Sequence, residues 1–219
     1  KPAAKKALWH LIDTSDVFIH SIRPQKIKKL GFGYEDVCVR NKRIIYAGIH
    51  GYQMGGPYSG EPAYDDVIQG QAGNVDLMAR LVGEPRYMPT IMADKTCALV
   101  AANSVMAALF ERERSNKGQF VEIPMFETMV AYNLTEHLYG YTFDPPEDQI
   151  GYTRVLAPSR RPYKTRDGYI CILVYTDKQW EDFWKEVGRP ELIKDPKFAT
   201  LSARSTNIEE LYTIKELLC

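Results

Sequence analysis

The sequence of 219 residues has no excess of charge of either sign and no shortage of hydrophobic residues. Its 28 Lys and Arg residues balance 28 Asp and Glu residues, so no net charge attracts nucleic acid or anionic lipid, and neither is expected as a partner. Hydrophobic residues make up 45% of the chain, which excludes an intrinsically disordered protein. The length is sufficient for one large or two smaller domains with their own cores.

Cysteine is scarce, and no two cysteines form a CxxC pair; they are Cys38, Cys97, Cys171 and Cys219. Such wide spacing is typical of reduced thiols in a cytosolic protein, so we expect a cytoplasmic location. Long hydrophobic runs are also missing. The longest, 96–110, contains Asn103 and Ser104 and is too short to span a bilayer, so no membrane partner is expected.

Several short catalytic motifs are absent as well. The sequence has no GxSxG, HExxH, Walker A or GxGxxG pattern, which removes the main signals for a serine hydrolase, a zinc peptidase, a P-loop enzyme and a dinucleotide-binding enzyme. The four histidines, His10, His20, His50 and His137, show no spacing typical of metal ligands. No metal site is therefore predicted.

Hydrophobic periodicity predicts an α/β chain with a parallel sheet in its first part. Runs rich in β-branched and aromatic residues predict strands over 16–22, 43–49 and 119–123. Helical periodicity predicts helices over 1–12, 24–30, 95–115 and 125–139, the first with Ala4, Leu8, Trp9, Leu11 and Ile12 facing inward. A strand, a helical crossover and a second strand suggest a βαβ unit, whose ligands usually bind beyond the carboxyl ends of the strands.

The second part of the chain has a different composition. A loop rich in Asp, Pro and Glu over 140–151 is the predicted linker, and a smaller unit follows it. In this smaller unit we expect a strand over 169–175 and an aromatic helix over 179–187. Its Trp180, Phe183 and Trp184 have helical spacing, which favours a place in the core.

The two ends of the sequence suggest a piece of a longer protein. The helix over 1–12 has no strand before it to pack against. A helical pattern that begins at Ile208 stops at Cys219 without a Gly or Pro terminator. We therefore expect the chain to be a fragment.

A loop rich in glycine and proline follows the strand over 43–49, and a helix is expected to begin near Tyr64. A surface turn is the commoner reason for such a loop. Glycines also let backbone N–H groups approach the oxygen of a carbonyl or thioester, as an oxyanion site requires. The candidates for that second role are Gly51, Gly55 and Gly56.

Asp94 stands at the amino end of the helix over 95–115, and local physics gives it two roles. As an N-cap, its carboxylate would accept backbone N–H bonds and stabilise the helix by about 1 kcal/mol. The same position keeps the carboxylate ionised beside the positive end of the helix dipole, which suits a nucleophile if one oxygen is left unbonded. The two roles do not exclude each other.

A basic cluster lies on the predicted helix over 24–30 and just before it, at Arg23, Lys26, Lys28 and Lys29. Such a cluster is usually a solvated helix face. At the carboxyl end of a strand it could instead bind a phosphorylated ligand. Both interpretations stay open at this level.

The order of several segments resembles the class III CoA-transferases, also called the CaiB/BaiF family. The segments are DVFIHSIRP, NKRIIYAGIHGYQMGGPY, PAYDDVIQGQAG, ADKTCALVAANSVMAALFERERSNKGQFVEIPMFE and RPYKTRDGYICI. The block from Asp94 to Glu127 is the most specific of them. The resemblance implies a nucleotide-binding-like large domain with a parallel sheet, to which 1–139 would belong, and a smaller α+β domain, to which 152–219 would belong. It also implies an interlocked homodimer.

The resemblance also implies a reaction. Asp94 matches the family's catalytic aspartate, which attacks an acyl-CoA thioester and carries first an acyl group and then CoA before a small carboxylic acid accepts the CoA. Coenzyme A is then a substrate, and no tightly bound cofactor is expected. The positions that match the family's CoA site are Ser21, Ile22, Arg23, Lys29, His50, Gly51 and Tyr52. Gly55 and Gly56 belong to the loop that would donate N–H groups to the charged intermediates.

Three of these positions depart from the usual family pattern. Ser21 and Ile22 stand where an Asn-Phe pair is common, and His50 stands where Ser, Thr or Lys is usual. The glycine-rich segment that formyl-CoA:oxalate transferases carry after the linker is also missing. Oxalate specificity is therefore not expected.

Two alternative functions remain at this stage. The same family includes α-methylacyl-CoA racemases, which have a His as second acid/base at the position of Tyr64. A tyrosine with an ordinary pKa of about 10 is a poor proton acceptor at neutral pH, which favours the transferase. The other alternative is a CoA-binding module without turnover, which the abrupt ends of the chain suggest.

Overall fold

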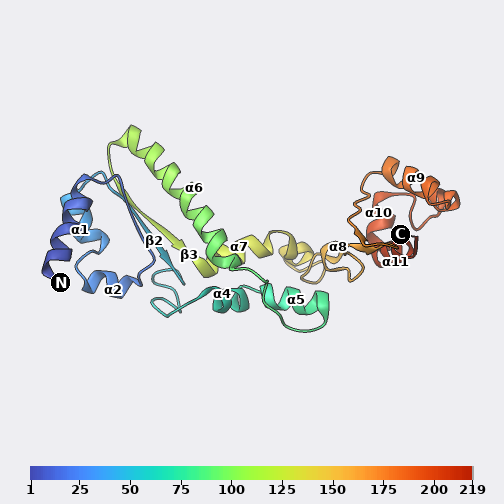
Figure 1. The fold of residues 1–219 in the computed structure, drawn as a ribbon, viewed down its shortest axis with the longest axis horizontal. Helices are drawn as coiled ribbons and strands as arrows, with labels where there is room; N and C mark the ends of the chain where they lie inside the picture. Colours follow the sequence, from blue (N-terminus) through green and yellow to red (C-terminus); the bar gives the residue numbers. More distant parts are fainter. Residues whose placement is uncertain (219) are drawn as a thin grey trace. The chain divides into compact units, whose positions relative to one another are not determined.

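The computed structural model describes residues 1–218, and the chain forms two compact units. The first unit contains 1–79 and 84–135; the second contains 80–83 and the chain from Glu136 onward. Figure 1 shows the path of the chain through both units. The predicted linker, 140–151, lies within the second unit, and the predicted domain division stays a prediction.

The first unit is built on three strands, β1 (Val17–His20), β2 (Ile45–His50) and β3 (Gln119–Pro124). Its helices, two of which extend into the second unit, are α1 (Pro2–Thr14), α2 (Pro24–Lys29), α3 (Tyr34–Arg40), α4 (Asp65–Gln71), α5 (Asn74–Val82), α6 (Met92–Ser115) and α7 (Met125–His137). The strands pair in the order β1-β2-β3, and both pairs are parallel. The predicted parallel sheet is confirmed.

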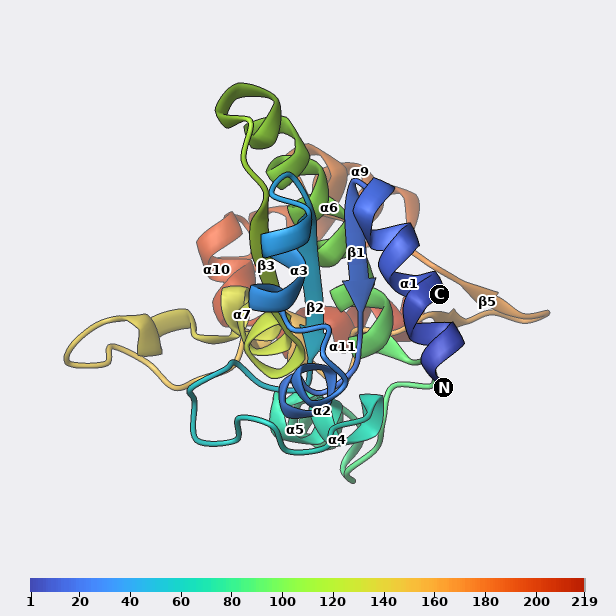
Figure 2. The ribbon, with the colours of Figure 1, turned by 90° about the vertical axis from the view of Figure 1, so that its left-hand side faces the viewer.

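The alternation of side chains along β2 divides the core of the first unit into two layers. Tyr46 packs with residues of α2 and α3, including Ile27 and Val37. Ala47 points to the opposite face and packs with residues of α6, including Cys97. Because successive residues of a strand point to opposite faces, this single strand is buried between two helical layers. Figures 1 and 2 show α6 along one face of the sheet and α2 on the opposite side, where Figure 2 also shows α3.

Helix α6 contacts the sheet through a stripe of small residues. Ala93, Cys97 and Ala101 follow one another at intervals of four residues, and all three are buried. Small side chains let the helix approach β2 and β3 closely, and the buried stripe explains why the helix lies against them. Larger apolar side chains on its other faces are exposed, namely Leu99, Val100, Met106 and Phe110.

By length and composition alone α6 could cross a membrane, since it has 24 residues and a mean hydropathy of 1.2 over its most apolar stretch. The core helix of an α/β layer has the same properties. In this unit α6 contacts α4, β2 and β3, as a helix packed on a sheet does. The prediction that no membrane is a partner is not tested by these observations.

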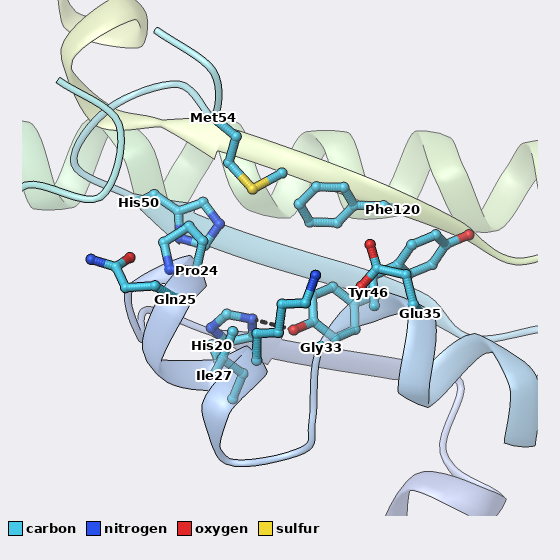
Figure 3. A pocket seen from close by; sticks show the side chains of 12 residues that line it. His20, Pro24, Gln25, Ile27, Gly33, Glu35, Tyr46, His50, Met54 and Phe120 are labelled. Atoms are coloured by element: carbon cyan, nitrogen blue, oxygen red, sulfur yellow. Dashed lines mark hydrogen bonds between the residues drawn. The ribbon is translucent and has the colours of Figure 1, made fainter. Parts of the chain in front are cut away.

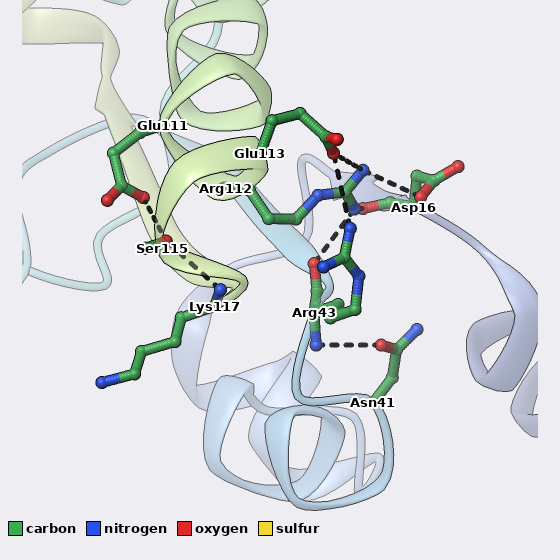
Figure 4. Close-up of polar contacts among 8 residues, drawn as sticks. All are labelled: Asp16, Asn41, Arg43, Glu111, Arg112, Glu113, Ser115 and Lys117. Carbon is green, nitrogen blue, oxygen red and sulfur yellow. Dashed lines mark hydrogen bonds and ion pairs between the residues drawn. The ribbon is translucent and has the colours of Figure 1, made fainter.

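Arg112 ties the carboxyl end of α6 to the starts of two strands. Its guanidinium donates to the backbone oxygens of Asp16, at 3.4 Å, and Arg43, at 3.1 Å, and pairs with the Asp16 carboxylate at 2.9 Å. Glu113 lies 3.7 Å from the same guanidinium (Figure 4). The side chain is buried, so these carbonyls have little water available as an alternative partner.

We expect Arg112→Met to lower the free energy of unfolding by about 1–3 kcal/mol, because buried carbonyl oxygens lose their donor. Urea denaturation monitored by circular dichroism measures the change. Arg43→Met is the matched control: its guanidinium forms an exposed pair with Glu113, so its loss costs at most about 1 kcal/mol. Equal losses in both variants would contradict the role of Arg112.

Three details of the sequence prediction were wrong. Helix α3 was not predicted, because the segment has only 7 residues, too few to show a helical period clearly. Gly33 and Asp36 start this helix, with the Asp36 carboxylate accepting the Gly33 N–H at 3.2 Å. Ala4 and Leu11 are exposed, because α1 packs on the unit through only one stripe, which includes Ile12.

The third detail concerns α6, which begins at Met92, three residues before the predicted start. It ends at Ser115, as predicted, before Asn116, whose φ of 59° is left-handed. A left-handed residue is a common way to end a helix, and Asn is one of the residues that adopts this conformation most easily.

The second unit has its own core around an aromatic helix. It contains η1 (Tyr139–Thr142), α8 (Thr153–Leu156), β4 (Tyr163–Lys164), β5 (Tyr169–Ile170), α9 (Asp177–Glu186), η2 (Pro190–Lys194), α10 (Leu201–Thr206) and α11 (Ile208–Leu218). Trp180 and Trp184 of α9 are buried with Leu211 of α11, which confirms their predicted place in the core. The predicted strand over 169–175 was too long, since β5 pairs with β4 only through Tyr169 and Ile170.

Candidate functional site

Asp94 lies in the first turn of α6, and it is not the N-cap that the sequence predicts. The N-cap is Ile91, which has no side chain to cap the helix. The Asp94 N–H instead donates to Oδ2 of Asp65 at 3.0 Å, so a carboxylate from α4 supplies the cap. The Asp94 side chain is exposed, and within residues 1–218 no hydrogen bond to its carboxylate oxygens is observed.

Asp65 is held by a second buried side chain. Asp65 is 7% exposed and Gln69 is 1% exposed. The Gln69 amide nitrogen donates to Asp65 Oδ1 and, at 3.2 Å, to the oxygen of Thr90. Its amide oxygen accepts the N–H of Met88 at 2.9 Å. This network fixes the segment that leads into α6 and, with it, the position of Asp94.

The surroundings of Asp94 make its carboxyl group more basic. Partial burial raises the pKa of Asp94 first, and the nearby negative charge of Asp65 raises it further. The backbone N–H groups at the start of α6 favour the ionised form, but the net direction is upward. A more basic carboxylate is a better nucleophile while it remains ionised at neutral pH.

The glycine-rich loop over 51–63 starts and ends close to this network. A Cβ at Gly51 would lie 2.4 Å from Cβ of Ala63, so only glycine fits against the chain just before Tyr64. The oxygen of Gly51 accepts the N–H of Phe126 at 3.0 Å, which joins the loop to the β3–α7 junction. Met125, at the same junction, lies next to Cys97 of α6.

Backbone N–H groups inside the loop donate hydrogen bonds to β3 and to other residues of the loop. Glu122 accepts the N–H of Met54 at 2.6 Å. The N–H of Gly55 donates to the Ser59 hydroxyl at 3.2 Å, and the N–H of Gly56 donates to the oxygen of Gln53 at 3.2 Å. These N–H groups are therefore occupied in this structure, and the predicted oxyanion role of Gly55 and Gly56 stays a prediction.

The residues after β1 contact the far end of the same loop. Arg23 donates to the oxygen of Gly60 at 3.3 Å, and Gln25 donates to it at 2.7 Å. Ser21 and Ile22 precede them and are exposed at the carboxyl end of the strand. The structure therefore brings the predicted segment 21–23 beside the glycine-rich loop.

Three other residues predicted for the site, Lys29, Tyr52 and Tyr64, differ in how exposed they are and in what they contact. Lys29 is exposed in the last turn of α2 and, among the described residues, makes no hydrogen bond or ion pair with the loop. Tyr52 is buried, and its hydroxyl lies 2.6 Å from the side-chain oxygen of Gln71. Tyr64 is 79% exposed, immediately before Asp65.

A cavity of about 240 Å³ lies on the α2/α3 side of the sheet (Figure 3). Two histidines from the ends of neighbouring strands, His20 and His50, line it together with aromatic residues such as Tyr34 and Phe120. The two imidazole ring centroids are 5.7 Å apart. A side chain at Gly48 would collide with His50, because its Cβ would lie 2.6 Å from the His50 Nε2 atom.

The hydrogen bonds of His20 define its tautomer. Its Nδ1 accepts the N–H of Ile22 at 3.1 Å, so the proton lies on Nε2. Nε2 is 2.9 Å from the Tyr46 hydroxyl, which donates its own proton to the oxygen of Phe32 at 2.8 Å. A neutral His20 thus positions the backbone at Ile22, one of the predicted CoA-binding residues, and sequence reasoning missed this role.

His50 is buried without a partner for one of its ring nitrogens. Its Nδ1 atom has no hydrogen bond in the described part of the chain. Burial lowers the pKa of His50 to about 4, with a further contribution from neighbouring His20. The imidazole is therefore neutral at physiological pH and can accept or donate one hydrogen bond to a ligand.

Three or more His, Cys, Asp or Glu side chains that could hold a metal ion are not found together among the described residues. The thiols of Cys38, Cys97 and Cys171 are unpaired, and Cys219 lies outside the described residues. The exposed Asp94 carboxylate at the start of α6 is therefore the candidate reactive group of the site.

The model of CoA-transferase family III matches residues 1–218.

The chain belongs to CoA-transferase family III. Among its curated relatives is the probable fatty acyl-CoA transferase Rv3272 of Mycobacterium tuberculosis, with 34% identity over 98% of this chain and 57% of the relative. The succinyl-CoA:glutarate CoA-transferase of Mus musculus is 30% identical over 97% of this chain and 49% of the relative. The chain spans about half the length of the curated relatives it matches.

Solved structures share the fold of this family III chain. The crystal structure of Rv3272 superimposes with a TM-score of 0.80 and 32% identity, covering 100% of this chain and 57% of that one. A CAIB/BAIF family protein from Brucella suis gives a TM-score of 0.75 and 27% identity, covering 99% of this chain and 57% of that one. The family resemblance and the α/β fold with a parallel sheet are thereby confirmed.

The buried His50 of this family III chain predicts a loss of stability in acid. The unfolded chain gains a proton near the ordinary pKa of about 6.5, whereas the folded chain resists protonation down to about 4. The free energy of unfolding should therefore fall as the pH drops from 6.5 towards 4. Denaturation at a series of pH values should show a shallower fall for His50→Gln. Exposed His10→Gln is the control and should leave the slope unchanged; an unchanged slope in His50→Gln would contradict the assignment.

Proposed function

We propose that the complete protein transfers coenzyme A from an acyl-CoA donor to a carboxylic acid, with Asp94 as the nucleophile. The observation that carries the proposal is the Asp94 carboxylate, which is exposed at the start of α6 and has its backbone, but not its side chain, engaged by Asp65. Membership of CoA-transferase family III supports the reaction class.

The reaction that we propose begins when an Asp94 carboxylate oxygen attacks the thioester carbonyl carbon. A C–O bond forms, the C–S bond breaks, and CoA leaves as a thiolate, which yields an aspartyl–acyl anhydride. The thiolate then attacks the Asp94 carbonyl and releases the first acid as a carboxylate, leaving CoA on Asp94 as a thioester. The acceptor carboxylate reverses these two steps with its own acyl group.

We place CoA at the carboxyl ends of β1 and β2. The segment 21–23 and the glycine-rich loop meet there through the bonds of Arg23 and Gln25 to Gly60. Exposed Lys29 and Arg23 add positive charge that suits the phosphates of CoA. Neutral His50 and the loop start at Gly51 belong to the same strand end, which is the usual ligand position in a parallel α/β sheet.

The names of the relatives support a carboxylic acid acceptor. Relatives are named for transfer from succinyl-CoA to glutarate or mesaconate, and one for transfer from acetyl-CoA to oxalate. Their acceptors are dicarboxylic acids, so a dicarboxylate is the first class to test. A panel of acyl-CoA donors and dicarboxylates, analysed by mass spectrometry, would identify the pair used by this protein.

Asp94→Asn should abolish formation of the covalent enzyme. Incubation of the complete wild-type protein with acyl-CoA and hydroxylamine should convert Asp94 to a hydroxamate, because hydroxylamine captures either the anhydride or the thioester. Peptide mass spectrometry locates the modification. Asp66→Asn, an exposed carboxylate change on α4, is the control and should leave the hydroxamate yield unchanged. Equal yields in wild type and Asp94→Asn would refute the proposed nucleophile.

The racemase remains the second candidate, and Tyr64 is the residue that bears on it. Its side chain is 79% exposed, and it precedes Asp65 at the position of the second acid/base in the resemblance. A racemase would exchange the α-proton of a 2-methylacyl-CoA with solvent deuterium. We expect no exchange, because a tyrosine is a poor proton acceptor at neutral pH. Exchange that depends on Tyr64 would replace the transferase proposal.

Two further properties belong to the same proposal. A non-catalytic CoA-binding module would bind CoA in calorimetry yet show no turnover in the same sample, whereas we expect both binding and turnover.

We also propose a homodimer, supported by the exposed apolar side chains on α6, such as Leu99 and Phe110. Light scattering on the complete protein measures its mass, and a monomer would exclude the dimer.

A further inference from the structure

The buried carboxylate of Asp65 is the feature that the proposed chemistry has not used. Ser, Thr, Asn and Asp all commonly cap helices, but a buried charge costs more than a buried hydroxyl. Here a charged cap, 7% exposed, lies directly beside the carboxylate proposed to react. Two like charges at one helix start disfavour each other, so the placement has a cost that a neutral cap would avoid.

Both carboxyl oxygens of Asp65 accept hydrogen bonds. The Met88 N–H donates to the Gln69 amide oxygen, which turns the Gln69 amide nitrogen towards Asp65. One oxygen of Asp65 therefore accepts from Gln69, and the other accepts from the Asp94 N–H at 3.0 Å. Both contacts are made by donors, so neither requires a proton on Asp65.

We propose that Asp65 is a positioning residue for Asp94 and that its fixed negative charge favours the states in which Asp94 carries an acyl group or CoA. This inference rests on the proposed transferase function. The Asp65–Asp94 N–H bond fixes the first turn of α6, and the Gln69 network prevents the Asp65 carboxylate from moving away. The reacting group is thereby held beside a like charge in every resting molecule.

Charge balance explains the direction of the effect. When Asp94 attacks the thioester, the C–O bond forms and the electron pair of the C–S bond leaves with sulfur. The negative charge moves from Asp94 to the CoA thiolate, and Asp94 becomes neutral in the anhydride. The repulsion from Asp65 is then relieved, and it returns each time Asp94 is released as a carboxylate.

Other charged groups near Asp94 do not cancel this effect. Lys95, the next residue on α6, is exposed and directs its ammonium to the Thr90 hydroxyl at 2.7 Å. The Cys97 thiol, one turn along α6, is neutral because burial, followed by the charges of Asp94 and Asp65, raises the pKa of Cys97 to about 11. From α4, the buried acidic side chain is that of Asp65.

The test compares removal of the charge with removal of its support, in the complete protein. Asp65→Asn keeps an oxygen that can accept the Asp94 N–H but removes the charge. Asp65→Ser is a second uncharged variant with a hydroxyl acceptor, for use if the Asn variant does not fold. Gln69→Leu keeps the charge and removes the amide contacts. Thermal melts establish which variants are folded.

The readouts are the rate of Asp94 acylation, followed by hydroxylamine trapping, and its pH profile. We expect the uncharged variants to acylate about 10- to 100-fold more slowly. The acid limb of the pH profile is the fall of the acylation rate at low pH as Asp94 becomes protonated. In the uncharged variants this acid limb should move to lower pH, because loss of the Asp65 charge makes Asp94 a stronger acid. Gln69→Leu should slow the reaction without moving that limb.

Three results would overturn the inference. A folded Asp65→Asn or Asp65→Ser protein that acylates at the wild-type rate would remove any role for Asp65. A slower rate with the acid limb at its wild-type position would reduce Asp65 to a structural cap. Absence of hydroxamate in the wild-type protein would overturn the transferase proposal itself, a failure distinct from the other two.

Discussion

One hydrogen bond, from the Asp94 N–H to the Asp65 carboxylate, determines where the end of α6 that carries Asp94 lies. The first N–H groups of a helix have no partner within the helix, and a buried start without a cap would be costly. Ile91 cannot cap α6, so the start of the longest helix in the first unit depends on a side chain from α4. Gln69 then connects the same carboxylate to the segment before α6.

The parallel sheet supplies the other half of the site. Because β2 is buried on both faces, its alternate residues fix α6 on one side and α2 with α3 on the other. The strand ends, in contrast, line a cavity, and both His20 and His50 are placed there. The core and the proposed CoA site therefore follow from one arrangement, in which the strand interiors are packed and the strand ends border the cavity.

Strong local patterns made much of this fold predictable from the sequence. The segments that became β1, β2, β3 and α6 were all predicted, because their periodicity extends over most of their length. Helix α3 was missed, since its segment has only 7 residues, too few to show a helical period clearly. An N-cap of α6 was one of the two roles considered for Asp94, whereas the cap comes from Asp65, 29 residues earlier, and a partner that distant leaves no local signal.

The same limit explains why the sequence could suggest the nucleophile but not its environment. Acidic residues at helix starts are common, and most have a partner: Asp36 accepts a backbone N–H before α3, and Asp177 of α9 pairs with Arg204. In the described residues the Asp94 carboxylate has neither kind of partner, although its backbone is capped by a second acid. Only the three-dimensional structure separates a carboxylate that caps a helix from one that the helix leaves exposed and without a partner.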